Sequence, residues 1–157
     1  MMRKQIINRS SKEPVTTDHA WLDLERLAQV EITSEETGHP VESALTTGGG
    51  AGWLASETGK QTIRLLFDEP QALKHIHLVF EEDRQERTHE FVLRWSDGGE
   101  SYREILRQQY TFSPPGATRE VEDYTVDLNG VTALELTIVP DISGGKARAS
   151  LISLRLE

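Results

Sequence analysis

The sequence predicts an all-β fold, a β-sandwich jelly roll of about eight antiparallel strands. Short segments in which apolar and polar residues alternate recur along the chain, and turn-forming residues separate them. Almost no segment places apolar residues at the spacing of an amphipathic helix. Each alternating strand has one apolar face, so two sheets packed face to face would bury these faces in a shared core.

The N-terminal region is predicted to contain a polar tail and one short helix or turn. Residues 1–17 are polar and lack periodicity, which is typical of a loose tail. Asp18 could cap a helix, because apolar residues follow it at helical spacings: Trp21, Leu22, Leu24 and Leu27. Residues 21–26 could also alternate as a strand, but a short helix or turn is favoured. A single domain is predicted over residues 18–157, because no linker or internal repeat divides them.

The strand candidates follow one another from Ala28 onward. In each of them, alternate positions are apolar and would face the core. They are Ala28–Ser34, Gln61–Phe67, Lys74–Phe80, His89–Trp95, Tyr102–Arg107, Tyr124–Leu128, Leu134–Ile138 and Ala149–Leu156. A turn at Asn129-Gly130 is predicted to separate the sixth strand from the seventh.

The clearest single element is a hairpin near the middle of the chain. Phe91, Leu93 and Trp95 share one face of its first strand. Asp97-Gly98-Gly99 supplies the turn, because glycine reaches positive φ without steric cost. Tyr102 in the second strand is predicted to close over the apolar face of the first.

The composition is that of an acidic chain without cysteine. The 157 residues carry a formal net charge of -9. This charge disfavours nucleic acid and anionic membranes as partners, because both would be repelled. The lack of cysteine excludes disulfides and thiolate zinc sites, and it fits a reducing compartment. No stretch approaches the roughly 20 apolar residues that span a bilayer, nor the apolar run of a signal peptide. We therefore predict a cytoplasmic protein with no membrane or nucleic-acid partner.

The order of these features resembles that of the discoidin family, also known as coagulation-factor type C or galactose-binding-like domains. The matching segments are the opening strand, a flexible loop ending in tryptophan, a strand ending in an acidic-proline step, the hairpin and the closing strand: Ala28–Ser34, Gly48–Trp53, Thr62–Pro70, Phe91–Tyr102 and Ala149–Leu156. The resemblance implies an intracellular, bacterial-type member of this family. It also implies a jelly-roll binding module whose ligand is met by loops at one end of the sandwich.

By this resemblance, three loops would form the ligand site: Glu35–Val41, Thr46–Trp53 and Glu81–His89. We predict that Arg84, Arg87 and His89 hydrogen-bond the hydroxyl groups of a sugar. Trp53 would supply an aromatic face against the apolar side of the sugar ring. The alternative is that Glu81–His89 is a solvated, charge-balanced loop and that Trp53 belongs to the core.

The predicted function is therefore non-catalytic carbohydrate binding. The alternative is an intracellular protein-interaction module, with Trp21, Tyr110 and Phe112 beside the Pro114-Pro115 loop as anchors, since aromatic residues dominate interface hot spots. No enzymatic activity is predicted, because no catalytic motif is present and no spacing forces two carboxylates to face each other across a cleft.

No cofactor is predicted. Many sugar-binding discoidin domains hold a structural calcium through backbone carbonyls, an aspartate in an Asp-Gly loop and a glutamate in the last strand. Here the loop Leu45–Gly50 has no acid, and Ser153 stands at the glutamate position. Calcium prefers six to eight oxygen ligands, commonly carboxylates, so we expect this site to be absent or weak. His75 and His77 share a face opposite the core and lack a third ligand, which argues against a metal there.

Overall fold

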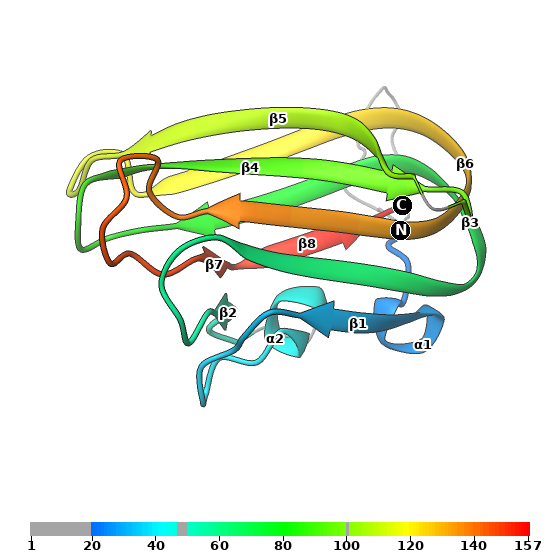
Figure 1. Cartoon of the computed structure of the whole chain (residues 1–157), viewed down its shortest axis with the longest axis horizontal. Helices are drawn as coiled ribbons and strands as arrows, with labels where there is room; N and C mark the ends of the chain where they lie inside the picture. Colours follow the sequence, from blue (N-terminus) through cyan, green and yellow to red (C-terminus); the bar gives the residue numbers. More distant parts are fainter. Residues whose placement is uncertain (1–19, 47–49, 100) are drawn as a thin grey trace, which may run out of the picture.

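Figure 1 shows the computed structural model, which describes residues 20–46, 50–99 and 101–157. The predicted tail at residues 1–17 and the Asp18 cap lie outside the described residues. The described chain contains two four-residue helices and eight strands: α1 (Leu24–Leu27), β1 (Ala28–Ile32), α2 (Glu42–Leu45), β2 (Trp53–Leu54), β3 (Gln61–Glu81), β4 (Arg87–Ser96), β5 (Arg103–Phe112), β6 (Arg119–Val139), β7 (Ser150–Leu151) and β8 (Ser153–Leu156). The all-β prediction is confirmed, and α1 is the short helix expected near the N-terminus. Neither helix of this described part is long and apolar enough to cross a membrane.

Two long strands connect the two layers of the sandwich. The first half of β3 pairs with β1 and with the second half of β6. The second half of β3 pairs with the first half of β6 and with β8. One layer therefore runs β1-β3-β6-β4-β5, and the other is formed by β6, β3 and β8. Figure 1 shows both long strands curving from one layer into the other at the same end of the molecule.

The prediction of separate short strands in these regions was wrong. Gln61–Phe67 and Lys74–Phe80 are two halves of β3, and Tyr124–Leu128 and Leu134–Ile138 are two halves of β6. The register between β3 and β6 shifts repeatedly between Leu66 and His75, where both strands bend. Gly130, with φ of 73°, lies at the bend of β6 rather than in a loop between strands. A bend therefore replaces the expected turn.

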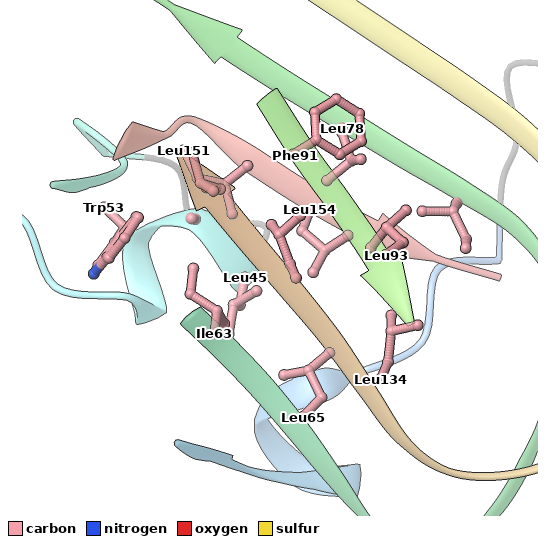
Figure 2. Packing of buried hydrophobic residues seen from close by; sticks show 14 of the residues in the cluster. Leu45, Trp53, Ile63, Leu65, Leu78, Phe91, Leu93, Leu134, Leu151 and Leu154 are labelled. Atoms are coloured by element: carbon pink, nitrogen blue, oxygen red, sulfur yellow. The ribbon is translucent and has the colours of Figure 1, made fainter. Parts of the chain in front are cut away.

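The core lies between the two layers and uses the predicted faces of the strands. Ile63 and Leu65 on β3 are 1% exposed, and Phe91 on β4 is fully buried. Figure 2 shows side chains from both layers gathered in this cluster, with Trp53 at its edge. Tyr102 departs from the prediction, because its ring lies 5.9 Å from the Arg64 guanidinium, which projects from the face of β3 opposite the core.

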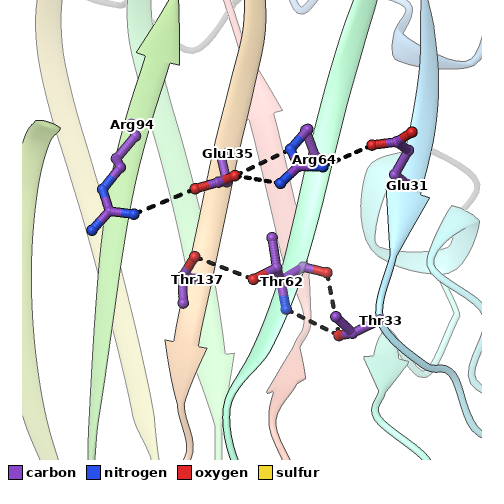
Figure 3. A network of polar contacts seen from close by, with 7 residues as sticks. All are labelled: Glu31, Thr33, Thr62, Arg64, Arg94, Glu135 and Thr137. Atoms are coloured by element: carbon purple, nitrogen blue, oxygen red, sulfur yellow. Dashed lines mark hydrogen bonds and ion pairs between the residues drawn. The ribbon is translucent and has the colours of Figure 1, made fainter. Parts of the chain in front are cut away.

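The outer face of the larger layer carries a ladder of paired charges across four strands (Figure 3). Arg64 on β3 lies between two carboxylates, with Nη1 2.8 Å from Glu31 Oε1 and Nη2 2.7 Å from Glu135 Oε2. Arg94 on β4 approaches the other oxygen of Glu135 at 3.6 Å. The charges of this ladder satisfy one another. Among the described residues, this ladder therefore offers no unpaired charge for a ligand, in contrast to the loop end of the sandwich.

Candidate functional site

A cleft of about 760 Å³ opens at the end of the sandwich opposite the strand bends. His39 from the β1–α2 connection and Ala51 from the loop before β2 line one part of it. The connection between β3 and β4 lines another part, through residues 81–85 and Arg87. These segments belong to the three loops predicted from the sequence to meet the ligand. The structure brings all three together in one concave surface.

The fourth wall of the cleft was missed by the sequence reasoning. Lys146, Arg148 and Ile152, from the segment around β7, also line it. Arg148 Nη1 lies 3.0 Å from Glu36 Oε1, which ties this segment to the β1–α2 connection. The signal that could have identified it is the pair of basic residues just before the last strands, in a loop that should reach the same end of the sandwich as the predicted loops.

Arg84 is the predicted ligand residue that the structure leaves accessible. It is exposed at the tip of the β3–β4 loop and lines the cleft. Its backbone N–H donates to Glu82 Oε2 at 2.9 Å, which fixes the turn of the loop. Among the described residues, its guanidinium has no hydrogen-bond or ion-pair partner. The side chain is thus available for a ligand.

Arg87 lines the cleft but is 5% exposed, and its guanidinium is committed to the protein. Nε donates to Glu82 Oε1 at 2.7 Å, and Nη1 donates to the carbonyl oxygen of Pro140 at 2.7 Å. The guanidinium carbon also lies 5.2 Å from the centre of the Phe112 ring. These contacts join the β3–β4 loop to the start of the β6–β7 connection. Arg87 therefore acts as a clamp between two walls of the cleft.

His89 lies in the core, at 1% exposure, and does not line the cleft. Phe80 and Phe112 surround its ring, with centroids at 4.6 and 5.0 Å. Its Nε2 is 2.6 Å from Oε1 of the equally buried Glu120. Burial, together with the charge of Arg87, lowers the pKa of His89 to about 4, so the ring is neutral at pH 7. A ligand in the cleft has no direct access to this imidazole.

Trp53 forms part of the cleft wall, yet its side chain is buried, with 1% exposure. The indole Nε1 donates to the backbone carbonyl of Ser34 at 2.9 Å. The ring is one of the largest fully buried side chains and packs in the main core cluster. It supports the cleft from below and does not present an open face to solvent.

The segment that the sequence analysis compared with the calcium site of discoidin domains is organised by an arginine. Arg155 of β8 donates from Nη1 to the carbonyl of Ala44 at 3.0 Å and from Nη2 to the carbonyl of Thr46. A guanidinium bound to these carbonyls disfavours a second cation beside them, because like charges repel. Calcium therefore does not fit this arrangement, although residues 47–49 of the predicted loop lie outside the described residues.

His75 and His77 lie on the outer face of β3, as predicted. Asp123 of β6 accepts from both rings through Oδ1, which lies 3.3 Å from His77 Nδ1 and closer to His75 Nε2. Trp21 packs against both imidazoles, with centroids at 5.6 and 6.0 Å. Across residues 20–46, 50–99 and 101–157, no group of three or more histidine, aspartate or glutamate side chains is arranged to hold a metal ion.

The aromatic anchors of the protein-interaction alternative are largely engaged within the fold. Phe112 is fully buried. Tyr110 is partly buried, lies 5.0 Å from the Phe112 ring and donates its hydroxyl to the carbonyl of Arg119 at 3.2 Å. Trp21 is partly buried against the histidines of β3. These three residues do not form an exposed aromatic patch.

Solved carbohydrate-binding modules share this fold. The family 32 module of AlyQ, in complex with 4,5-unsaturated mannuronic acid, matches with a TM-score of 0.63 and 16% identity, over 88% of this chain and 98% of that chain. The family 32 module of C. perfringens NanJ, in complex with galactose, matches with a TM-score of 0.64 and 14% identity, over 87% and 96%. A pectin-binding module matches with a TM-score of 0.60 and 13% identity, over 84% and 91%.

These similarities establish the galactose-binding-like sandwich predicted from the sequence. Some similar structures are parts of enzymes. One is a truncated AlyQ that contains a family 32 module and an alginate lyase domain, and the match covers 31% of that chain. No protein-family model matches the chain, and no curated protein matches it in sequence. At the identities of these neighbours, the likeness shows the fold alone.

Proposed function

We propose that this protein is a non-catalytic carbohydrate-binding module that holds its sugar in the cleft at the loop end. The observation that supports this most is the convergence of the three predicted loops on one open concave surface. The fold adds to this support, because solved neighbours hold galactose or a mannuronic acid derivative.

The size and chemistry of the cleft suit a small sugar. Sites for small ligands usually measure roughly 300–1,000 Å³, and this cleft measures about 760 Å³. Charged side chains such as Arg84 and Lys146 can donate hydrogen bonds to oxygen atoms of a sugar. Leu54 and Ile152 add apolar surface that could contact its C–H groups. Both kinds of contact are needed, since a sugar has polar edges and less polar faces.

The proposal includes no catalysis by this domain. The two glutamates of the cleft wall are occupied by arginines, since Glu81 pairs with Arg119 and Glu82 pairs with Arg87. Neither is a free acid or base poised beside a ligand. A cytoplasmic location remains a prediction, supported by the lack of cysteine and tested by fractionation of native cells.

The test is a glycan array with the purified protein, run with calcium and with a chelator. We expect a coherent set of bound glycans and the same set in both conditions. The Ala51→Trp variant should abolish binding, because a large ring would fill the cleft that Ala51 lines. Ala72→Trp is the matched control, since Ala72 is exposed at the strand bend, at the other end of the molecule.

A blank array in both conditions would overturn the proposal and favour the protein-interaction alternative. Binding that survives Ala51→Trp as well as it survives Ala72→Trp would place the sugar elsewhere on the molecule. In either case, purification of the protein from native extract with one stoichiometric partner would support the alternative.

A further inference from the structure

We propose that the cleft selects anionic sugars, those with a carboxylate or a sulfate group, and that Arg84 and Lys146 together recognise this group. The inference rests on the proposed carbohydrate-binding function and deepens it by naming the class of ligand. It follows from the charges of the cleft, from the way its walls are fixed, and from the aromatic surface that it lacks.

Arg84 and Lys146 are the free cations of the cleft. Both are exposed, both line it, and neither has a hydrogen-bond or ion-pair partner among the described residues. Arg148 adds a third positive charge, which is shared with Glu36 at 3.0 Å. A sugar with an anionic group could neutralise the two free cations by charge-assisted hydrogen bonds, which are stronger than those made by hydroxyl groups.

The acidic residues of the cleft compensate these cations only in part. Glu81 and Glu82 already pair with Arg119 and Arg87. Asp83, which is exposed, is the remaining acid of the lining. Among the residues that the structure describes, the cleft lining therefore holds one unpaired carboxylate and two unpaired cations, in a protein whose formal net charge is -9. A locally positive cleft on an acidic protein is what selective binding of an anionic ligand requires, because the remaining surface repels it.

The two cations lie on different loops, and the clamp at Arg87 fixes these loops relative to each other. Arg87 bonds to Glu82 in the loop that carries Arg84, and to Pro140 at the start of the connection that carries Lys146. A backbone bond from Ile142 N to Thr88 O, at 2.9 Å, reinforces this junction. Fixed walls reduce the entropy lost when a ligand bridges them.

The cleft lacks the aromatic platform on which neutral sugars usually stack. Trp53 is the aromatic residue that lines it, and its side chain is 1% exposed. His39 is partly buried and is the other ring in the lining. With little ring surface available among the described residues, affinity has to come from polar and ionic contacts. This favours a ligand that carries its own charge.

The experiment compares three probes by isothermal titration calorimetry: oligogalacturonate, a sulfated galactan oligosaccharide and a neutral galactan oligosaccharide of the same length. We expect at least one anionic probe to bind more tightly than the neutral one, with an affinity that falls as salt is raised from about 0.05 M to about 0.5 M. The uronate and the sulfated probe separate the two possible sources of the anionic group.

Two substitutions test the named residues. Arg84→Gln and Lys146→Gln should each weaken binding of the anionic probe about 10- to 100-fold, the effect of losing one charge-assisted hydrogen bond. The neutral probe should lose far less affinity, because glutamine can still donate a hydrogen bond to a hydroxyl group. Arg26→Gln is the matched control, because Arg26 has a side-chain exposure of 74% and belongs to α1. Figure 1 shows α1 at the end of the molecule where β3 bends, opposite the β3–β4 loop that lines the cleft. This control removes the same charge and should leave all three probes unchanged.

Two results overturn the inference, and they differ in what they say of the proposed function. In the first result, neutral and anionic probes bind equally, Ala51→Trp blocks both, and Arg84→Gln and Lys146→Gln have no effect. The cleft would then be a carbohydrate site that does not select for charge. Failure of all three probes and of the glycan array would remove the proposed function as well. Circular dichroism of each variant establishes that a lost signal reflects binding and not folding.

Discussion

Arg87 offers the sharpest test of how the cleft is held together. We predict that Arg87→Met lowers the free energy of unfolding by about 3 kcal/mol, although methionine retains most of the side-chain length. The substitution removes two hydrogen bonds of 2.7 Å, to Glu82 and to the carbonyl of Pro140. Breaking one side of a buried ion pair costs about 3–5 kcal/mol, and the 13% exposure of the Glu82 side chain places the loss at the lower end.

The direction of the Glu82 pKa shift agrees with a stabilising ion pair. Burial opposes ionisation of Glu82, but hydrogen bonds from the Arg87 guanidinium and from the Arg84 backbone outweigh it and lower the pKa of the carboxyl. Without Arg87, the carboxylate would remain half-enclosed with its principal partner lost. Glu82→Gln in the Arg87→Met background should therefore recover part of the lost stability, because it removes the unpaired charge.

The assay is urea unfolding followed by tryptophan fluorescence for the wild type, both single variants and the double variant. We expect a coupling free energy of about 2 kcal/mol between Arg87 and Glu82. Arg84→Gln is the control and should stay within about 0.5 kcal/mol of the wild type, since its side chain is exposed. A loss below about 1 kcal/mol for Arg87→Met would refute the clamp.

Three further predictions concern the surroundings of the cleft. Gly52→Ala should lower the free energy of unfolding by about 2–3 kcal/mol, because φ is 83° and the new Cβ would lie 2.7 Å from the carbonyl oxygen of Leu151. Gly59→Ala is the control: φ is 84° but no atom lies within 4 Å, so it should cost only the backbone strain of about 1 kcal/mol. Equal costs for the two variants in thermal or urea unfolding would contradict this packing. In an NMR titration His89 should change charge near pH 4, since burial and the charge of Arg87 lower its pKa to about 4. The neutral ring then contributes about 3 kcal/mol to the free energy of unfolding above pH 6.5, and this contribution is lost as the pH falls from 6.5 through 4. A titration midpoint of about 6 for His89 would show that the ring is not buried in a neutral form. Arg155→Ala should lower the free energy of unfolding by about 2 kcal/mol, because it leaves two carbonyls without their donor. A calcium chelator should leave the melting temperature of the wild type unchanged. A lower melting temperature on chelation would contradict the conclusion that Arg155 takes the place of calcium.

The sequence predicted the fold because alternation is a local signal. Each half of β3 shows it clearly, and Ile63 and Ile76 are buried as expected. The signal did not show that the two halves of β3 form one strand, or that the two halves of β6 do. Pro70 in β3 and the Asn129-Gly130 step in β6 both favour a break between strands. Whether such a step ends a strand or bends it depends on pairing with a distant partner, here between β3 and β6. That pairing is absent from local sequence.

The loops of the candidate site were predicted from the resemblance to discoidin domains, but three of the four predicted ligand residues, Trp53, Arg87 and His89, have buried side chains. Arg87 and His89 precede Phe91 and Leu93 by even numbers of residues and therefore share their inward face. The same alternation that identified the core could have shown this. Charge suggested exposure instead, although a charged group can be buried when it is paired, as Arg87 is with Glu82.

Lys146 was missed for a different reason. Its loop contains serine and glycines and shows no periodic pattern, so the pair of basic residues, Lys146 and Arg148, is the one local signal. Its position in the cleft comes from the antiparallel pairing of β2 with β7, which brings residues 53 and 151 together. Residues that meet only through long-range pairing require the three-dimensional structure.

The most direct test of the carbohydrate-binding cleft is an NMR titration of the isotope-labelled protein with oligogalacturonate and, separately, with the neutral galactan oligosaccharide. The structure predicts that one or both probes shift the backbone amides around Arg84, Lys146 and Arg148, while amides near Arg64 on the outer sheet face stay unchanged. Shifts that gather around Arg64, or no shifts with either probe, would contradict a sugar site in the cleft.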